Sequence, residues 1–422
     1  MGRTARDNRD RPHPRPVQKI VLSEGNTKQR LIAVGLLLIL GGLALGYAFS
    51  QLMTPDSGWQ AIEASTSAGP NCGDEFVFRY ELGAGGASPA AENRAVSALY
   101  TDECRKLFQL FHTVESFEGI TNLRDLSLHP NETLTVDAEL YQALETVARS
   151  GDRTIYLGPV YARYGDLFYC ADDSQLVDFD PYLSDEVRKE YGSIAAFARD
   201  PEAVDVRLLG EGKVCLYVSE EYLAYAQREG IERFLDFGWM KNAFIADALA
   251  QALQEAGFTN GTITSYDGFI RNLDERGTNY SLGVYDYVGD TAWPAAVMQY
   301  DGPMSMVELR NYAANGLDSQ RIYRLKNGER RSSYLSPEDG RCKSAANDLL
   351  CYSKTAGCGE IALRIAPIYV AEMLDVSALA ALADVGIQSV YCENREIRGT
   401  DRSLTLADLY EAEGVRYTVS VK

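Results

Sequence analysis

Residues 234–273 read FLDFGWMKNAFIADALAQALQEAGFTNGTITSYDGFIRNL, and they predict a strand, a tight turn, a long helix and a second strand in succession. Apolar residues recur in the middle of this stretch at the three-to-four-residue spacing of one helix face. They are Met240, Phe244, Ile245, Ala248, Leu249, Ala252, Leu253 and Ala256. Gly257 then ends the helix where a left-handed residue costs least. Outward from this unit, runs of hairpin strands stand apart from the helices, which indicates an α+β fold.

The beginning of the chain differs from the rest in charge and hydropathy. Residues 1–30 hold eight Lys or Arg against three acids, with three closely spaced prolines, which predicts a solvated basic tail. Residues 31–54 carry no charge, and LIAVGLLLILGGLALGYAFSQLMT is about long enough to cross a bilayer as one helix. A cleaved signal peptide is the alternative, but this run is longer than a usual signal-peptide core. We expect an uncleaved transmembrane helix in contact with the lipid bilayer.

The charge balance predicts where the rest of the chain lies. The basic tail should stay in the cytoplasm, so a linker over residues 55–72 and a folded domain over residues 73–422 are expected outside the cell membrane. Removing the tail's eight Lys or Arg and three acids from the totals of 41 and 60 leaves 33 basic and 57 acidic residues, a formal charge of −24. Such a surface argues against nucleic acid as a partner. All eight cysteines lie in this part, where either disulfides or buried free thiols fit their number.

One segment of the central unit is similar to a motif of a known family. Asp236-Phe237-Gly238, followed by Phe244 and Asp247, matches without gaps. It resembles the segment Asp-Leu-Gly-Gly-Ile-Ala-Lys-Gly-Tyr-Ala-Val-Asp of the FAD:protein FMN transferases, the ApbE family. The chain departs from that segment elsewhere, because the second glycine of the family is Trp239 here, its lysine is Asn242 and its next glycine is Ala243.

Further matches follow in the same order along residues 73–371, so the resemblance covers most of the expected domain. The chain therefore resembles a diverged ApbE-like protein, which implies a T-fold-related α+β domain. Ala314-Asn315-Gly316 lies where the family has Thr-Ser-Gly.

The second family signature, His-Ile-Ile-Asp-Pro-x-Thr-Gly, falls on the segment SYLSPEDG. Pro337 and Gly340 keep its turn. Its histidine, aspartate and threonine are replaced, by Ser333, Ser336 and Asp339. Loss of the imidazole removes the side chain there that could exchange a proton near neutral pH.

Twenty residues beyond Gly340 the resemblance implies an aspartate, and four residues later a threonine, beside the magnesium ion that holds the FAD diphosphate. The chain has Glu360 and Arg364 at these positions. Glutamate can still offer oxygen to Mg²⁺, but arginine repels the ion. Arg364 either pairs with Glu360 one helical turn away or binds a phosphate directly.

These matches define a candidate flavin site with no assigned catalytic residue. Its members are Asp236, Gly238, Asn315, Gly316, Ser333, Pro337, Gly340 and Arg364, with Glu360 as the metal ligand. We expect a membrane-anchored, extracytoplasmic protein that binds flavin but has lost transferase chemistry. The first alternative is an active enzyme that uses Mg²⁺ and FAD to attach FMN to Thr or Ser of an exported acceptor protein, with Asp236, Asp339 and Glu360 as the nearest carboxylates. The second is an interaction scaffold without flavin.

Overall fold

The computed structural model describes residues 57–86 and 88–421. The basic tail and the transmembrane helix expected over residues 1–54 lie outside these residues. Within the described ranges, no helix combines the length and the apolar character that crossing a bilayer requires.

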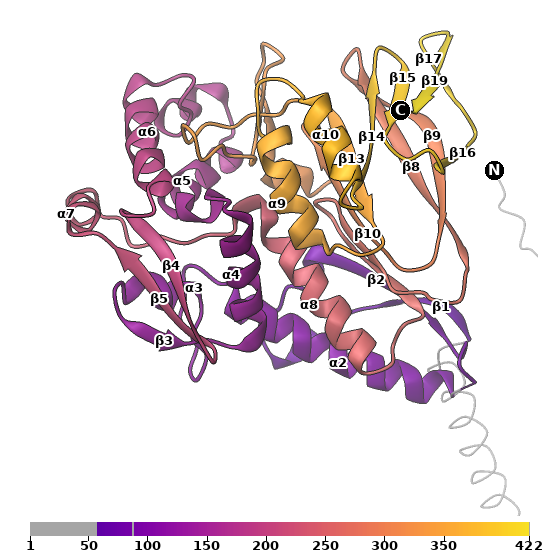
Figure 1. The fold of residues 1–422 in the computed structure, drawn as a ribbon, viewed down its shortest axis with the longest axis horizontal. Coiled ribbons are helices and arrows are strands. Elements are labelled where there is room, and N and C mark those ends of the chain that lie inside the picture. The colour runs from indigo at the N-terminus through magenta and orange to yellow at the C-terminus, as the bar shows by residue number, and fades with distance from the viewer. Residues whose placement is uncertain (1–56, 87, 422) are drawn as a thin grey trace, which may run out of the picture. The chain divides into compact units, whose positions relative to one another are not determined.

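A nine-stranded sheet forms the middle layer of the described part, in the order β1-β2-β6-β7-β10-β13-β14-β15-β19 (Figure 1). Neighbouring strands are antiparallel except β15 and β19, which are parallel. The strands are β1 (Gly58–Ile62), β2 (Phe76–Leu82), β6 (Gly261–Ser265), β7 (Phe269–Asn272), β10 (Met304–Arg310), β13 (Asp348–Ser353), β14 (Gln388–Glu393), β15 (Glu396–Gly399) and β19 (Thr418–Val421).

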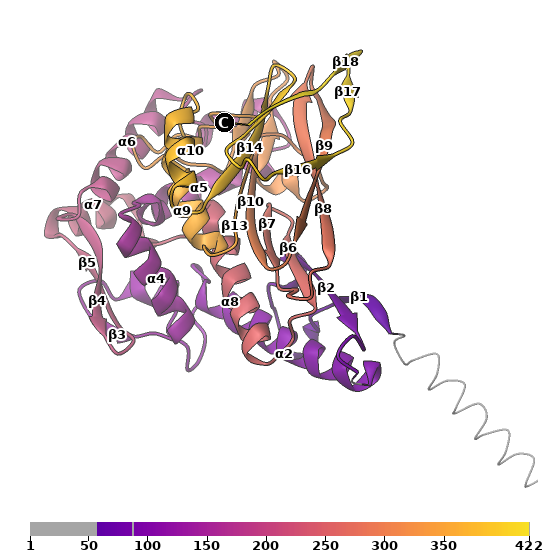
Figure 2. The same cartoon turned by 45° about the vertical axis from the view of Figure 1, so that its right-hand side comes forward.

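Helices cover one face of this sheet and a smaller sheet covers the other (Figure 2). Helices α8 (Lys241–Glu255) and α9 (Cys358–Tyr369) pack on each other and on β7, while β8 (Asn279–Val288), β9 (Thr291–Asp301) and β16 (Thr405–Ala407) form the third layer. Strand β13 alternates between the two cores, as a strand buried on both faces requires. Leu349 and Cys351 belong to the core between the sheet and the helices. Leu350 and Tyr352 belong to the core between the sheet and strands β8 and β9.

The remaining elements flank these layers. The helices are α2 (Pro89–Leu110), α3 (Leu123–Leu128), α4 (Ala138–Ser150), α5 (Gly158–Tyr164), α6 (Asp185–Arg199), α7 (Glu220–Glu229) and α10 (Val376–Ala383). The short 3-10 turns are η2 (Thr66–Ala68), η3 (Gly73–Glu75), η4 (Thr154–Leu157), η5 (Gly165–Tyr169), η6 (Asp173–Asp178), η7 (Gly238–Met240) and η8 (Asp318–Gln320). The minor strands are β3 (Thr133–Thr135), β4 (Val204–Gly210), β5 (Lys213–Val218), β11 (Ile322–Arg324), β12 (Arg330–Ser332), β17 (Glu411–Ala412) and β18 (Val415–Arg416).

The α+β class and the central helix are confirmed, and two local predictions are wrong. Residues 58–62 were expected in a linker, but they form β1 and pair antiparallel with β2. Residues 234–237 were expected to be a strand, but they join no ladder because other groups take their amides. Ser127 Oγ accepts hydrogen bonds from the amides of Phe234 and Leu235, and the carbonyl oxygen of Ile155 accepts that of Asp236. All eight cysteines are free thiols, five of them buried.

Candidate functional site

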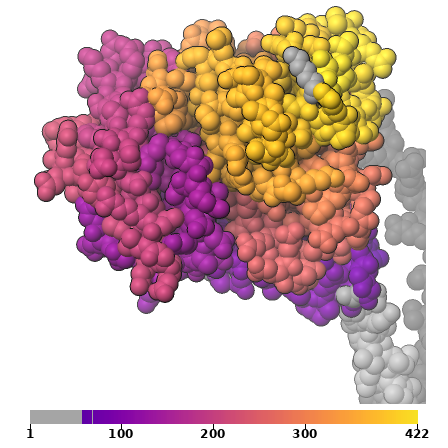
Figure 3. Space-filling model, viewed as in Figure 1, coloured from indigo at the N-terminus to yellow at the C-terminus, as the bar shows by residue number. Residues whose placement is uncertain are grey.

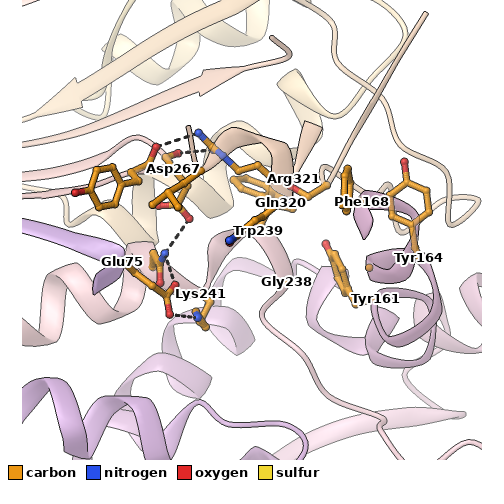
Figure 4. A pocket seen from close by; sticks show the side chains of 15 residues that line it. Glu75, Tyr161, Tyr164, Phe168, Gly238, Trp239, Lys241, Asp267, Gln320 and Arg321 are labelled. Carbon is orange, nitrogen blue, oxygen red and sulfur yellow. Dashed lines mark hydrogen bonds and ion pairs between the residues drawn. The ribbon is translucent and has the colours of Figure 1, made fainter. Parts of the chain in front are cut away.

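A cavity of about 260 Å³ lies where η7 and the start of α8 meet α5, η5 and the segment around η8. Its lining comes from parts of the chain that are far apart in sequence. Its charged, amide and large aromatic side chains include Glu75, Tyr161, Tyr164, Phe168, Trp239, Lys241, Asn242, Asp267 and Arg321. Figure 4 shows the charged groups on one side of this cavity and the aromatic rings of α5 and η5 on the other.

Paired charges form the first side of the cavity. The carboxylate of Glu75, at the end of η3, accepts hydrogen bonds from Lys241 Nζ at 2.8 Å and from Asn242 Nδ2 at 2.9 Å. Asn242 Nδ2 also donates to Asp267 Oδ2 at 3.0 Å. The first turn of α8 is thereby tied to η3 and to the turn between β6 and β7.

Burial and charge oppose each other in this cluster. Burial alone lowers the pKa of Lys241, but the negative charge and hydrogen bond of Glu75 outweigh it, so this pKa is raised above its ordinary value. Burial raises the pKa of Asp267, against the opposing positive charge of Arg321. The ammonium of Lys241 is therefore held charged by a partner inside the protein.

Arg321 is the second cation of the cavity, and protein groups already bind it. Its guanidinium donates to the carbonyl oxygens of Tyr266 at 3.0 Å and Asp267 at 3.1 Å, and it forms an ion pair with buried Asp318. Two cations and two carboxylates thus line the cavity, and their formal charges cancel. A diphosphate would have to compete with these internal partners.

Aromatic rings form the other side. Five cavity-lining residues carry a buried polar atom without a protein partner, namely the Tyr161 and Tyr164 hydroxyls, Trp239 Nε1, Asn242 Oδ1 and Asp267 Oδ1. Trp239 and Asn242 are each only 6% exposed, yet Trp239 Nε1 and Asn242 Oδ1 form no hydrogen bond. Unsatisfied buried groups of this kind are costly in a folded protein. Gly238 has φ +53° and an added Cβ would overlap the ring of Tyr161, so glycine is required for this packing.

The structure brings several predicted site residues to this cavity. Gly238 and Ser333 line it. Asn315 lies at its edge, where Nδ2 donates to the Tyr266 carbonyl at 3.1 Å, and Gly316 directly precedes a lining residue. Asp236 supports the lining residue Gly238, because its Oδ1 accepts a hydrogen bond from the amide of Gly238 at 2.8 Å. Burial raises the pKa of this carboxyl group. Two segments that resemble separate family signatures therefore converge.

Pro337 and Gly340 belong to a supporting turn and are not among the cavity-lining residues. The amide of Gly340 donates to the carbonyl of Ser336 at 2.8 Å, and the glycine packs directly on Tyr191 of α6. Asp339, an expected neighbour of the metal, forms ion pairs with Arg341 and Lys343 instead.

Glu360 and Arg364 lie in a different groove. They form an ion pair of 2.9 Å and are 44% and 43% exposed, respectively. Their groove, about 380 Å³, runs between α9 and α4, which pack together on the face shown in Figure 3. In the described ranges, no three His, Cys, Asp or Glu side chains converge. The positive charge of Arg364 beside Glu360 opposes a cation at the expected ligand.

Sequence reasoning missed the charged cluster. Lys241 directly precedes Asn242, the position at which the family has its lysine, so a cation displaced by one residue was the available signal. Glu75, Asp267 and Arg321 offered none, because only the fold brings these residues together.

Comparison with known proteins supports the same fold. No family model and no curated protein matches the sequence. The ApbE protein of Thermotoga maritima is similar in structure with a TM-score of 0.52 at 14% identity, over 79% of this chain and 94% of that chain. The flavin transferase ApbE of Vibrio cholerae has a TM-score of 0.53 at 14% identity, over 85% of this chain and 98% of that chain. The protein has a diverged ApbE-like fold.

Proposed function

We propose that this protein binds the ring system of a flavin in the cavity beside Trp239 and does not transfer FMN. The observation that carries this proposal is an aromatic-lined cavity whose lining residues hold five buried polar atoms without a protein partner, among them the donor Trp239 Nε1 and the acceptor Asn242 Oδ1. An isoalloxazine ring offers hydrogen-bond acceptors and an N–H donor along one edge, and its flat face can stack on aromatic side chains.

The size and charge of the cavity favour the ring over the whole of FAD. Its volume of about 260 Å³ is below the ~300–1,000 Å³ of typical ligand pockets. The cations that could attract a diphosphate are already paired, as shown for Lys241 and Arg321.

The same residues argue against transfer chemistry. Ser333 faces the cavity where the resemblance implies a histidine, and a serine cannot exchange protons at neutral pH as an imidazole does. Glu360 is neutralised by Arg364, so the carboxylate expected for Mg²⁺ is not free.

We also propose that residues 31–54 anchor the protein in the cell membrane with residues 57–421 outside the cytoplasm. The support is the uncharged run of that segment and the basic residues that precede it. Protease treatment of intact cells should then remove the C-terminal part, and its full protection would contradict this orientation.

A binding experiment tests the flavin proposal on the full-length chain in mild detergent. The fluorescence of riboflavin, FMN and FAD should be quenched on binding. The three affinities should be similar, because the ring is the shared group. FAD with Mg²⁺ and a Thr- and Ser-containing acceptor protein should release no AMP. Release of AMP would favour the active transferase, and failure of all three flavins to bind would favour a scaffold without flavin.

Matched tryptophan variants locate the site. Trp239→Phe removes the buried N–H donor, and the loss of one hydrogen bond of about 1 kcal/mol should weaken flavin binding about fivefold. Trp293 on β9 is the control, because its Nε1 is also buried without a partner but it lies outside the cavity. Equal effects of W239F and W293F would place the flavin elsewhere.

A further inference from the structure

Cys72 and Cys104 meet where η3 packs on α2. The amide of Cys72 donates to the carbonyl oxygen of Cys104 at 3.3 Å, and Cys72 Sγ lies 3.2 Å from the same oxygen. Standard bond lengths then keep the two Cα atoms within about 7 Å of each other, close to the separation that a disulfide needs. Both residues are buried, at 1% and 0% exposure.

The side chain of Cys72 points toward Cys104, because its Sγ approaches the carbonyl oxygen of that residue. A hydrogen bond with the Cys104 thiol, together with burial, raises the pKa of Cys72 well above its ordinary value. The other cysteines differ, since none of their thiols has a cysteine partner in the described ranges. Cys170 and Cys358, for example, donate to backbone carbonyl oxygens.

We propose that Cys72 and Cys104 form a disulfide when the chain folds in the presence of an oxidant. The oxidant is another disulfide, either of a small thiol such as oxidised glutathione or of a thiol–disulfide oxidoreductase. One cysteine thiolate attacks it to form a mixed disulfide, and the second cysteine thiolate then displaces the remaining thiol. The two cysteines lose two protons and two electrons, and the oxidant is reduced to two thiols.

The bond has a structural consequence at the cavity. Cys72 is the residue before η3, and Glu75 at the end of η3 holds both Lys241 and Asn242. A covalent link from Cys72 to α2 therefore restrains the short element that positions Glu75. Because the cysteines are 32 positions apart, closing this loop also removes considerable freedom from the unfolded chain.

Differential thiol labelling of the full-length chain tests the disulfide. The chain is refolded with reduced and oxidised glutathione, denatured with a first alkylating reagent, then reduced and labelled with a second reagent. Peptide mass spectrometry should find the second reagent at Cys72 and Cys104 alone, and the non-reduced digest should contain their cross-linked peptides. The first reagent at both positions, or a link to another cysteine, would overturn the proposal.

Thermal unfolding gives an independent readout. The oxidised protein should melt roughly 5 °C above the reduced protein, and Cys104→Ala should abolish this difference. Cys351→Ala is the matched control, because Cys351 is equally buried but has no cysteine partner, and it should keep the difference. If C104A does not fold, the labelling of the unsubstituted chain decides. Neither readout involves flavin, so the outcome is independent of the proposed binding.

Discussion

Replacing Asp247 by alanine distinguishes a scaffold role from a ligand-binding role for this acid of the family-like motif. Its carboxylate caps the N-terminus of α9, where Oδ1 accepts the amide of Cys358 at 2.9 Å and Oδ2 accepts that of Gly359 at 2.8 Å. It also forms an ion pair with Arg271 of β7, and the two side chains are 27% and 19% exposed. The carboxylate thus joins α8, α9 and the sheet.

The expected loss of stability follows from these contacts. Removing a helix cap costs about 1 kcal/mol. Leaving a mostly buried arginine without its partner costs about 2 kcal/mol at this degree of exposure. We therefore expect Asp247→Ala to lower the free energy of unfolding by about 3 kcal/mol. Asp247→Asn keeps one acceptor oxygen but not the charge, so its loss should be intermediate.

Urea unfolding of the full-length chain, followed by circular dichroism, measures this loss as a shift of the midpoint at constant slope. Glu360→Ala on the same helix is the control, since its exposed pair with Arg364 is worth only about 0.3–0.5 kcal/mol. Equal losses for D247A and E360A would refute the assignment of Asp247 to the scaffold. A normal midpoint together with lost flavin binding would instead make it a ligand contact.

Three further outcomes are expected. Burial, and then the nearby charge of Glu308, raise the pKa of Asp348 well above its ordinary value, so the folded state holds a proton that the unfolded state releases above about pH 4. Stability should therefore fall as the pH rises from 4 towards the folded-state pKa. Melting temperatures measured from pH 4 to 8 should show this slope for the unsubstituted chain but not for Asp348→Asn. An unchanged slope in the variant would contradict the assignment. Gly238→Ala forces Tyr161 to move and should weaken flavin binding at least about tenfold, by more than 1.4 kcal/mol. Gly165→Ala adds a methyl group that meets nothing, and the melting temperature of this variant should be unchanged. Arg364→Ala should leave flavin affinity unchanged in the same titration. A weakened affinity would instead support the alternative that Arg364 binds a phosphate of the flavin directly.

Local sequence patterns predicted the elements whose stability comes from one amphipathic face. The apolar spacing over residues 240–256 predicted α8, and the observed helix spans Lys241–Glu255. The strand expected at residues 234–237 does not form, because strand pairing depends on distant partners. Here the amides of Phe234 and Asp236 donate hydrogen bonds to Ser127 and Ile155 instead. Strand β1 was missed for the same reason, since it exists through its pairing with β2.

The candidate site was predictable only where its residues sit in motifs. Gly238 and Ser333 were found from two separate motifs and do line one cavity. The ion pairs of that cavity join residues up to 166 positions apart, as for Glu75 and Lys241. No rule of sequence spacing applies over such separations, so these ion pairs could be identified only from the fold.

The retained and the replaced motif residues have different physical roles. Asp236 fixes the amide of Gly238, Phe244 packs directly on Gly359, and Asp247 caps α9. Phe244 and Asp247 thus join α8 to α9, whereas Asp236 fixes the turn before α8, and the loss of any of the three would cost folding energy whatever the protein does. The replaced positions that line the cavity, Asn242 and Ser333, take no part in these scaffold contacts. A fold can therefore stay similar at 14% identity while residues that line its cavity are replaced.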